Sequence, residues 1–97
     1  MAAGYVIAQV EVTDPETYET YRAQVPATVA KFGGEFLARG GKCEGLEGAA
    51  PLGRTVILKF PSYDQALAWY NSDDYAGPKD IRKGASRGNL LVVEGVD

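Results

Sequence analysis

The spacing of apolar residues constrains the fold of this 97-residue chain more than any other feature. Strand patterns, in which side chains point alternately to the two faces of a sheet, occur over residues 5–12, 35–39, 54–60 and 89–94. Helix patterns, with apolar residues three and four positions apart, occur over residues 15–32 and 62–70. This order predicts an α+β fold of the ferredoxin-like βαββαβ type, with a four-stranded antiparallel sheet and helices on one face.

Capping residues mark the limits of the first predicted helix. The Asp14 side chain can accept backbone N–H groups that have no partner inside a helix, and Pro15 suits the first helical position. Gly33 ends the helix, because glycine readily adopts the left-handed conformation found there. Pro26 lies inside it and should kink or break it, because proline has no N–H to donate. The apolar stripe consists of Tyr18, Tyr21, Val25, Val29 and Phe32.

The second half of the chain has weaker helix signals. Ser62 caps the second predicted helix, whose buried stripe should consist of Tyr63, Leu67 and Tyr70, with Ala66 beside them. Trp69 is one position away from this stripe, which suits a pocket wall or an interface. Residues 71–77 have the composition of a turn that carries Tyr75, and residues 78–83 that of a short third helix.

The sheet face that points away from the helices should also carry apolar side chains. Ile7, Leu37 and Ile57 fall on this face by the two-residue period of a strand. An uncovered sheet face with such side chains is a common association surface. We therefore expect a homodimer that forms through the sheet.

Composition excludes several classes of function. The chain has no histidine, so Ser-His and Cys-His catalytic pairs are impossible and the usual zinc and iron sites are disfavoured. The single cysteine, Cys43, excludes an internal disulfide, and the net charge of −3 disfavours nucleic acid as a partner. The chain has neither the cationic opening of a secretory signal nor an apolar run of the roughly 20 residues that cross a bilayer. We expect one cytoplasmic domain over residues 1–97 with no metal, no cofactor and no membrane partner.

A series of short motifs along the whole chain supports a more specific assignment. The motifs include Gly4-Tyr5-Val6, Asp14-Pro15, Gly33-Gly34, Arg39-Gly40-Gly41, Leu46-Glu47-Gly48, Phe60-Pro61-Ser62, Trp69-Tyr70 and Val93-Glu94-Gly95. This series resembles the bacterial family called domain of unknown function 1330. The resemblance implies a dimeric α+β barrel, in which two four-stranded sheets face one another. Related barrels include cofactor-free monooxygenases, muconolactone isomerases and dye-decolourising peroxidases, but kinship of fold transfers no chemistry.

Three arginines, Arg39, Arg54 and Arg82, are candidates for ligand binding. Arginine keeps its charge in proteins, so a guanidinium drawn into a cleft needs an anionic or carbonyl partner. One interpretation is a clamp for a carboxylate or a similar small anion. The other is structural, with the arginines forming salt bridges to Glu11, Glu35, Glu47 or Glu94.

Four tyrosines form a second group of candidates, Tyr18, Tyr21, Tyr70 and Tyr75. They could line a cleft between the helices and the sheet, where their hydroxyls would donate hydrogen bonds to a ligand. The other interpretation is that they are core residues with satisfied hydroxyls.

Together these residues predict a small-molecule-binding protein. It would act either as a cofactor-independent enzyme on a small anionic or aromatic substrate, or as a binding module. The alternative is a non-catalytic regulatory or structural homodimer.

Overall fold

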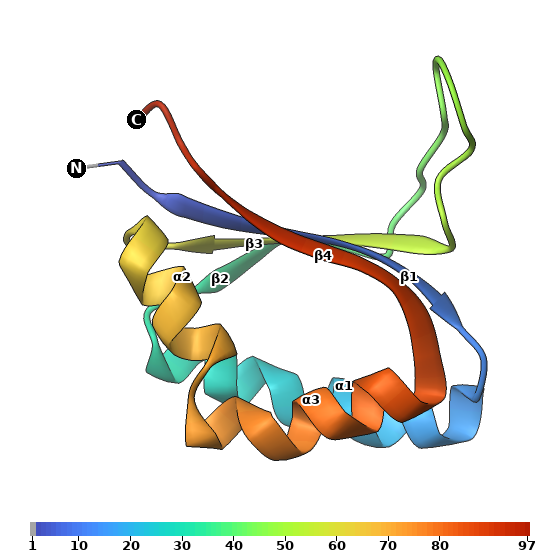
Figure 1. The fold of residues 1–97 in the computed structure, drawn as a ribbon, viewed down its shortest axis with the longest axis horizontal. Coiled ribbons are helices and arrows are strands. Elements are labelled where there is room, and N and C mark those ends of the chain that lie inside the picture. The colour runs from blue at the N-terminus through green and yellow to red at the C-terminus, as the bar shows by residue number, and fades with distance from the viewer. Residues whose placement is uncertain (1) are drawn as a thin grey trace.

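Residues 2–97, described by a computed structural model, form a four-stranded antiparallel sheet with helices packed on one face (Figure 1). The elements in chain order are β1 (Gly4–Val12), α1 (Pro15–Lys31), β2 (Glu35–Arg39), β3 (Arg54–Phe60), α2 (Tyr63–Tyr70), α3 (Asp73–Ala85) and β4 (Ser86–Glu94). The strands lie in the order β2-β3-β1-β4. The predicted ferredoxin-like α+β fold is therefore confirmed.

The first half of the chain follows its sequence signals closely. Asp14 caps α1, since its carboxylate accepts the Thr17 N–H at 3.2 Å and the Thr17 hydroxyl at 2.7 Å. The strands β2 and β3 have the predicted limits. The expectation that Pro26 would break the first helix is wrong, because α1 continues through it as one helix.

The region that precedes β4 differs from its prediction. The turn predicted over residues 71–77 is limited to residues 71 and 72, because α3 begins at Asp73 and carries Tyr75 in its first turn. Ser72 caps this helix by accepting the Tyr75 N–H at 3.1 Å. The cap and two acidic residues at the positive end of the helix outweigh the effects of glycine and proline farther along. The strand β4 then starts at Ser86, three residues earlier than predicted.

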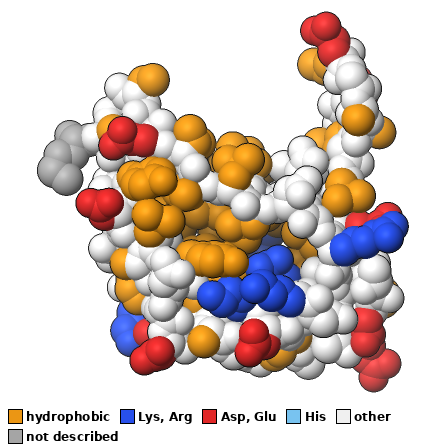
Figure 2. Space-filling model, viewed as in Figure 1, with side chains coloured by type: hydrophobic (Ala, Val, Ile, Leu, Met, Phe, Trp, Pro, Cys, Tyr) orange, Lys and Arg blue, Asp and Glu red, His pale blue; other side chains and the backbone are white. Residues whose placement is uncertain are grey.

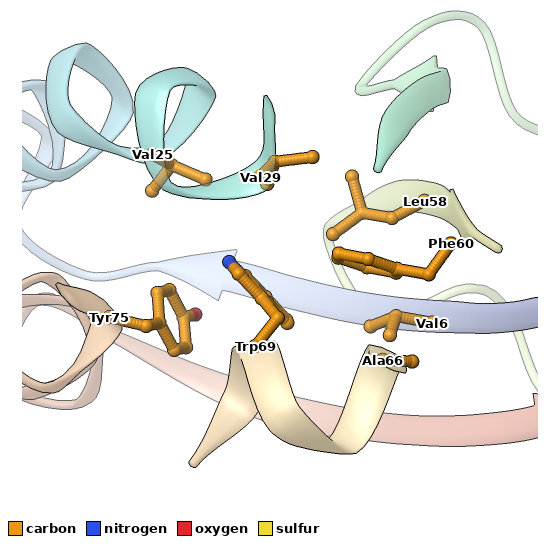
Figure 3. Close-up of a cluster of buried hydrophobic side chains, with 8 residues drawn as sticks. All are labelled: Val6, Val25, Val29, Leu58, Phe60, Ala66, Trp69 and Tyr75. Atoms are coloured by element: carbon orange, nitrogen blue, oxygen red, sulfur yellow. The ribbon is translucent and has the colours of Figure 1, made fainter. Parts of the chain in front are cut away.

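The centre of the core is Trp69, which is 1% exposed. It lies between Tyr75 of α3 and Phe60 of β3, with ring centroids 4.1 Å and 5.3 Å away (Figure 3). The predicted stripe of α2 is therefore displaced by one position, since Trp69 is buried together with Ala66, which was expected beside the stripe, whereas Tyr63 is 36% exposed. Trp69 has the largest apolar surface on this two-turn helix, so its burial stabilises the fold most, whereas Tyr63 at the margin keeps its hydroxyl in water.

The sheet face opposite the helices is uncovered and partly apolar. Leu91, Ile7 and Ile57 lie side by side in register across β4, β1 and β3. Leu91 is 51% exposed, and Leu37 and Val93 are similarly exposed. Residues 40–53, which join β2 to β3, extend away from the helices on this side of the sheet (Figure 1). Within residues 2–97, no helix combines the length and apolar character that a membrane span needs.

Candidate functional site

A cavity of about 40 Å³ lies between the inner face of the sheet and the helices. The space-filling view shows a hollow between the sheet and the helices, where basic side chains lie against hydrophobic ones (Figure 2). Its apolar wall comes from strands and helices alike and includes Val6, Ala8, Val10, Val25, Phe36, Val56, Leu58, Trp69 and Leu90. Its polar lining consists of two tyrosines and four arginines, namely Tyr18, Tyr21, Arg22, Arg39, Arg54 and Arg82.

A chain of hydrogen bonds connects α1 to α3 at one end of this cavity. The hydroxyl oxygens of Tyr21 and Tyr75 are 2.9 Å apart. The Tyr75 oxygen also accepts a hydrogen bond from Nε of Arg82 at 3.3 Å. Tyr75 is completely buried, so it holds Tyr21 and Arg82 in place from behind the cavity lining. The bond to Tyr75 uses Nε alone and leaves the terminal nitrogens of Arg82 for another partner.

Pro26 explains how Arg39 is held. In a regular helix the Arg22 carbonyl would accept the N–H of residue 26, but proline has none. Nη2 of Arg39 donates to this free carbonyl at 2.9 Å. The Arg39 guanidinium also lies over the Phe36 ring, 4.4 Å from its centroid. Arg39 of β2 thus provides the hydrogen bond that Pro26 cannot give to the Arg22 carbonyl of α1, and the positive charge of Arg39 lies at the cavity wall.

Two further arginines have hydrogen-bonding capacity to spare. Nε of Arg54 and Nε of Arg22 are buried without a hydrogen-bond partner in the described part of the chain. Arg54 makes one long bond of 3.4 Å to the Arg39 carbonyl, and its guanidinium lies 5.7 Å from the centroid of the Tyr18 ring. Buried donors are rarely left unpaired in proteins, so these nitrogens indicate a place for an acceptor.

Charge is unbalanced at this cavity. Its lining within residues 2–97 contains four arginines and no carboxylate. Only Arg22 has an ion-pair partner, Glu19 at 3.0 Å. The salt bridges considered for Arg39, Arg54 and Arg82 do not form within this part of the chain, and Glu11 pairs with Arg87 instead. An overall acidic chain therefore concentrates uncompensated positive charge at one half-enclosed site.

The protonation states of the lining residues follow from their surroundings. Burial raises the pKa of Tyr21, and the adjacent Tyr75 raises it further. Burial also raises the pKa of Tyr18, although Arg54 and Arg82 act in the opposite direction. Both tyrosines are therefore neutral hydrogen-bond donors at physiological pH. Burial is the largest single influence and lowers the pKa of Arg82, but Tyr75, Tyr21 and Tyr70 together raise it by more, so the pKa rises and the guanidinium stays charged.

The structure brings together most of the residues that the sequence suggested. Tyr18, Tyr21, Arg39 and Arg82 line the cavity, and Tyr75 is bonded to two of them. Tyr70 instead lines a separate outer hollow, which is described below. Sequence reasoning missed Arg22, although its spacing from Tyr18 and Val25 places it on the same side of α1.

The family model described as "Domain of unknown function (DUF1330)" matches residues 3–96. The chain belongs to this family. The resemblance drawn from the motifs is thus confirmed for DUF1330. Comparison with the curated proteins gives no match.

Solved structures share the fold of this DUF1330 chain. The methylated RPA0582 protein has a TM-score of 0.79 at 14% identity, with 99% of this chain and 82% of that chain covered. A second structure of RPA0582, described as a protein of unknown function from Rhodopseudomonas palustris, has a TM-score of 0.77 at 14% identity and coverages of 99% and 84%. SnoaB, described as a cofactor-independent oxygenase from Streptomyces nogalater, has a TM-score of 0.65 at 10% identity and coverages of 100% and 96%. Identities this low establish the fold alone.

Proposed function

We propose that this chain binds a small organic anion in the inner cavity, with the anionic oxygens on the guanidinium groups of Arg39, Arg54 and Arg82. The observation that carries the proposal is the group of arginines without a carboxylate partner among the described residues. Withdrawing a charge from water without a partner of opposite sign carries a free-energy cost. An anion would offset that cost, and the planar guanidinium fork suits a carboxylate.

The size of the cavity limits the ligand. One water molecule needs about 10–15 Å³ of such space, and a cavity of about 150 Å³ accommodates benzene. The cavity here measures about 40 Å³, which suits a group of a few heavy atoms. A small aliphatic carboxylate therefore fits better than the aromatic substrate that the tyrosines suggested.

The lining supports one kind of chemistry in particular. It provides positive charge and neutral tyrosine hydroxyls, and within residues 2–97 it has no side chain that would accept a proton at neutral pH. Such a site stabilises negative charge that develops on a bound molecule. If the chain is an enzyme, its substrate must ionise without help from a basic side chain of this lining. SnoaB, described as a cofactor-independent oxygenase, shares the fold, but its likeness carries over no residue.

We also propose that two copies pair through the uncovered sheet face. The row formed by Leu91, Ile7 and Ile57 supports this proposal, because exposed or partly exposed apolar side chains in register offer a surface for another copy. Analytical ultracentrifugation should then give a dimer for the parent chain and a monomer for Leu91→Lys. A parent chain that sediments as a monomer would refute the pairing without affecting the ligand proposal.

The ligand proposal is tested by isothermal calorimetry with formate, acetate, propionate and benzoate. We expect acetate or propionate to bind and benzoate to bind more weakly. Binding should also raise the Tm: a ligand at 100 times its dissociation constant adds about 2.7 kcal/mol to the free energy of unfolding, which is several degrees for a domain of this size. Arg82→Gln should weaken binding by about tenfold or more, because it removes a charged hydrogen bond. Lys42→Gln, which removes one charge from the exposed connection, is the matched control and should bind like the parent chain.

The results separate the two functions. Binding that Arg82→Gln weakens and Lys42→Gln does not would support the anion site. No binding of any of the four acids by the folded parent chain would refute it, and a dimer without ligand would then leave the structural homodimer as the remaining function.

A further inference from the structure

A second hollow, of about 370 Å³, opens beside the inner cavity. The two spaces share Arg82 and Leu90 in their linings. The outer hollow is also lined by Tyr70, Lys83, Ser86 and Arg87, which lie at the end of α2 and around the junction of α3 and β4. Arg82 therefore lies between a small inner space and a larger outer one.

The outer hollow is basic as well. Lys83 and Arg87 flank Arg82 in its lining, which contains no carboxylate within residues 2–97. Lys83 has no ion-pair partner in this part of the chain. Arg87 pairs with Glu11 through Nε, but the Arg87 side chain is 72% exposed, and a surface pair of this kind contributes little to stability. Its terminal nitrogens remain available.

Hydrogen bonds reduce the repulsion that the end of α3 would exert on an anion. Exposed carbonyl groups at the end of a helix would normally repel negative charge. The Ala85 carbonyl accepts the N–H groups of Thr13 and Asp14 at 2.9 Å and 3.0 Å. The Arg82 carbonyl accepts the Ser86 hydroxyl at 2.6 Å. Two of the last four carbonyls of α3 are therefore occupied, and the formal charges in the lining of the outer hollow are all positive.

We infer that the ligand is a dianion, with one anionic group in the inner cavity and a second, a carboxylate or a phosphate, in the outer hollow against Lys83 and Arg87. This inference rests on the proposed function and specifies its ligand class. The inner cavity holds only a few heavy atoms, so a longer molecule must continue into the outer space. Tyr70 would form a wall for the connecting carbons, since its ring is fixed by Lys79, whose Nζ lies 4.2 Å from the ring centroid and donates to the Tyr70 carbonyl at 3.1 Å.

The experiment compares acids of equal length with one and two anionic groups. Calorimetry would measure butyrate against succinate, pentanoate against glutarate and hexanoate against adipate, with phosphoglycolate as the phosphate probe. We expect at least one dianion to bind about tenfold more tightly than its monoanion, as one additional charged hydrogen bond allows. If a dicarboxylate binds more tightly than phosphoglycolate, the anionic group in the outer hollow is a carboxylate; if phosphoglycolate binds more tightly, it is a phosphate.

Substitution of Lys83 tests whether the second anionic group of the ligand binds in the outer hollow. Lys83→Gln should abolish the advantage of the dianion and leave the affinity for the monoanion within about twofold, while Lys42→Gln should change neither. Raised salt should weaken the dianion more than the monoanion, because partly exposed charges are screened.

The possible failures are distinguishable. If monoanions bind and dianions bind no more tightly, or if the advantage survives Lys83→Gln, the inference is overturned and the proposed function stands. If a dianion binds and Arg82→Gln does not weaken it, the link between the two spaces is overturned. If no acid binds, the proposed function fails and this inference fails with it.

Discussion

Tyr75→Phe removes a single oxygen atom, but that oxygen joins two elements at the cavity. It lies 2.9 Å from the Tyr21 hydroxyl and accepts the Arg82 Nε hydrogen at 3.3 Å. Phenylalanine fills the same space against Trp69, so the substitution leaves the packing of the ring unchanged. Its effect therefore isolates the hydrogen bonds.

The magnitude follows from the two bonds. A bond between neutral groups contributes about 0.5–1.5 kcal/mol and one to a charged group about 1.5–3 kcal/mol. The Arg82 bond is long, and the variant no longer buries a hydroxyl, so both contributions fall at the low end. We expect Tyr75→Phe to lower the free energy of unfolding by about 2 kcal/mol.

Urea unfolding followed by tryptophan fluorescence measures this loss, because Trp69 is the only tryptophan and lies in the core. The midpoint should fall with an unchanged slope. Tyr63→Phe is the control, since the Tyr63 side chain is 36% exposed, and it should stay within about 0.5 kcal/mol of the parent. A Tyr75→Phe variant as stable as this control would refute the structural role of the hydroxyl.

Three further outcomes can be measured with the same assay. Ser72→Ala should cost about 1 kcal/mol, because it removes the cap of α3, and an unchanged urea midpoint would contradict this role. Gly53→Ala should cost about 2 kcal/mol or more, because φ is +64° at this position and an added Cβ would overlap the Val10 carbonyl; equal stability would show that the connection adjusts. Burial raises the pKa of Tyr21 above the ordinary value near 10, so the folded state keeps this proton more tightly than the unfolded chain. The contribution of Tyr21 to the free energy of unfolding is complete below about pH 10 and falls above it, by at most about 1.4 kcal/mol per pH unit. Tyr21→Phe should therefore make the decline of stability at alkaline pH less steep. Equal slopes for the variant and the parent would contradict the raised pKa.

The elements with several agreeing signals could be predicted from the sequence. The strand β3 combines alternating apolar residues with Pro61 directly after it, and its limits are those predicted. The helix predicted over residues 78–83 lies inside α3, but residues 73–77, which were assigned to a turn, form the start of the same helix. The signal that could have corrected this assignment is Ser72 followed by two aspartates, which is a helix start.

The site was harder to predict than the fold. Helical spacing placed Tyr18 and Tyr21 correctly on the inner side of α1, but it does not show which residues meet across layers. Salt bridges were one interpretation of Arg54, yet its buried Nε lacks a partner among residues 2–97. A salt bridge depends on the distance between side chains of different elements, and periodicity along one element does not contain that distance.

Pro26 makes α1 less stable as an isolated helix, but it frees the carbonyl through which β2 is attached to α1. As a free peptide, the segment of α1 would be more helical with alanine at this position, by about 3 kcal/mol in the helix interior. In the folded chain, alanine would restore the internal bond and compete with Arg39 for the Arg22 carbonyl. Design methods that optimise each helix separately would therefore select against Pro26 and would release the β2 arginine from its anchor. The most helical sequence for α1 is, for this reason, not the one that best orders the cavity wall.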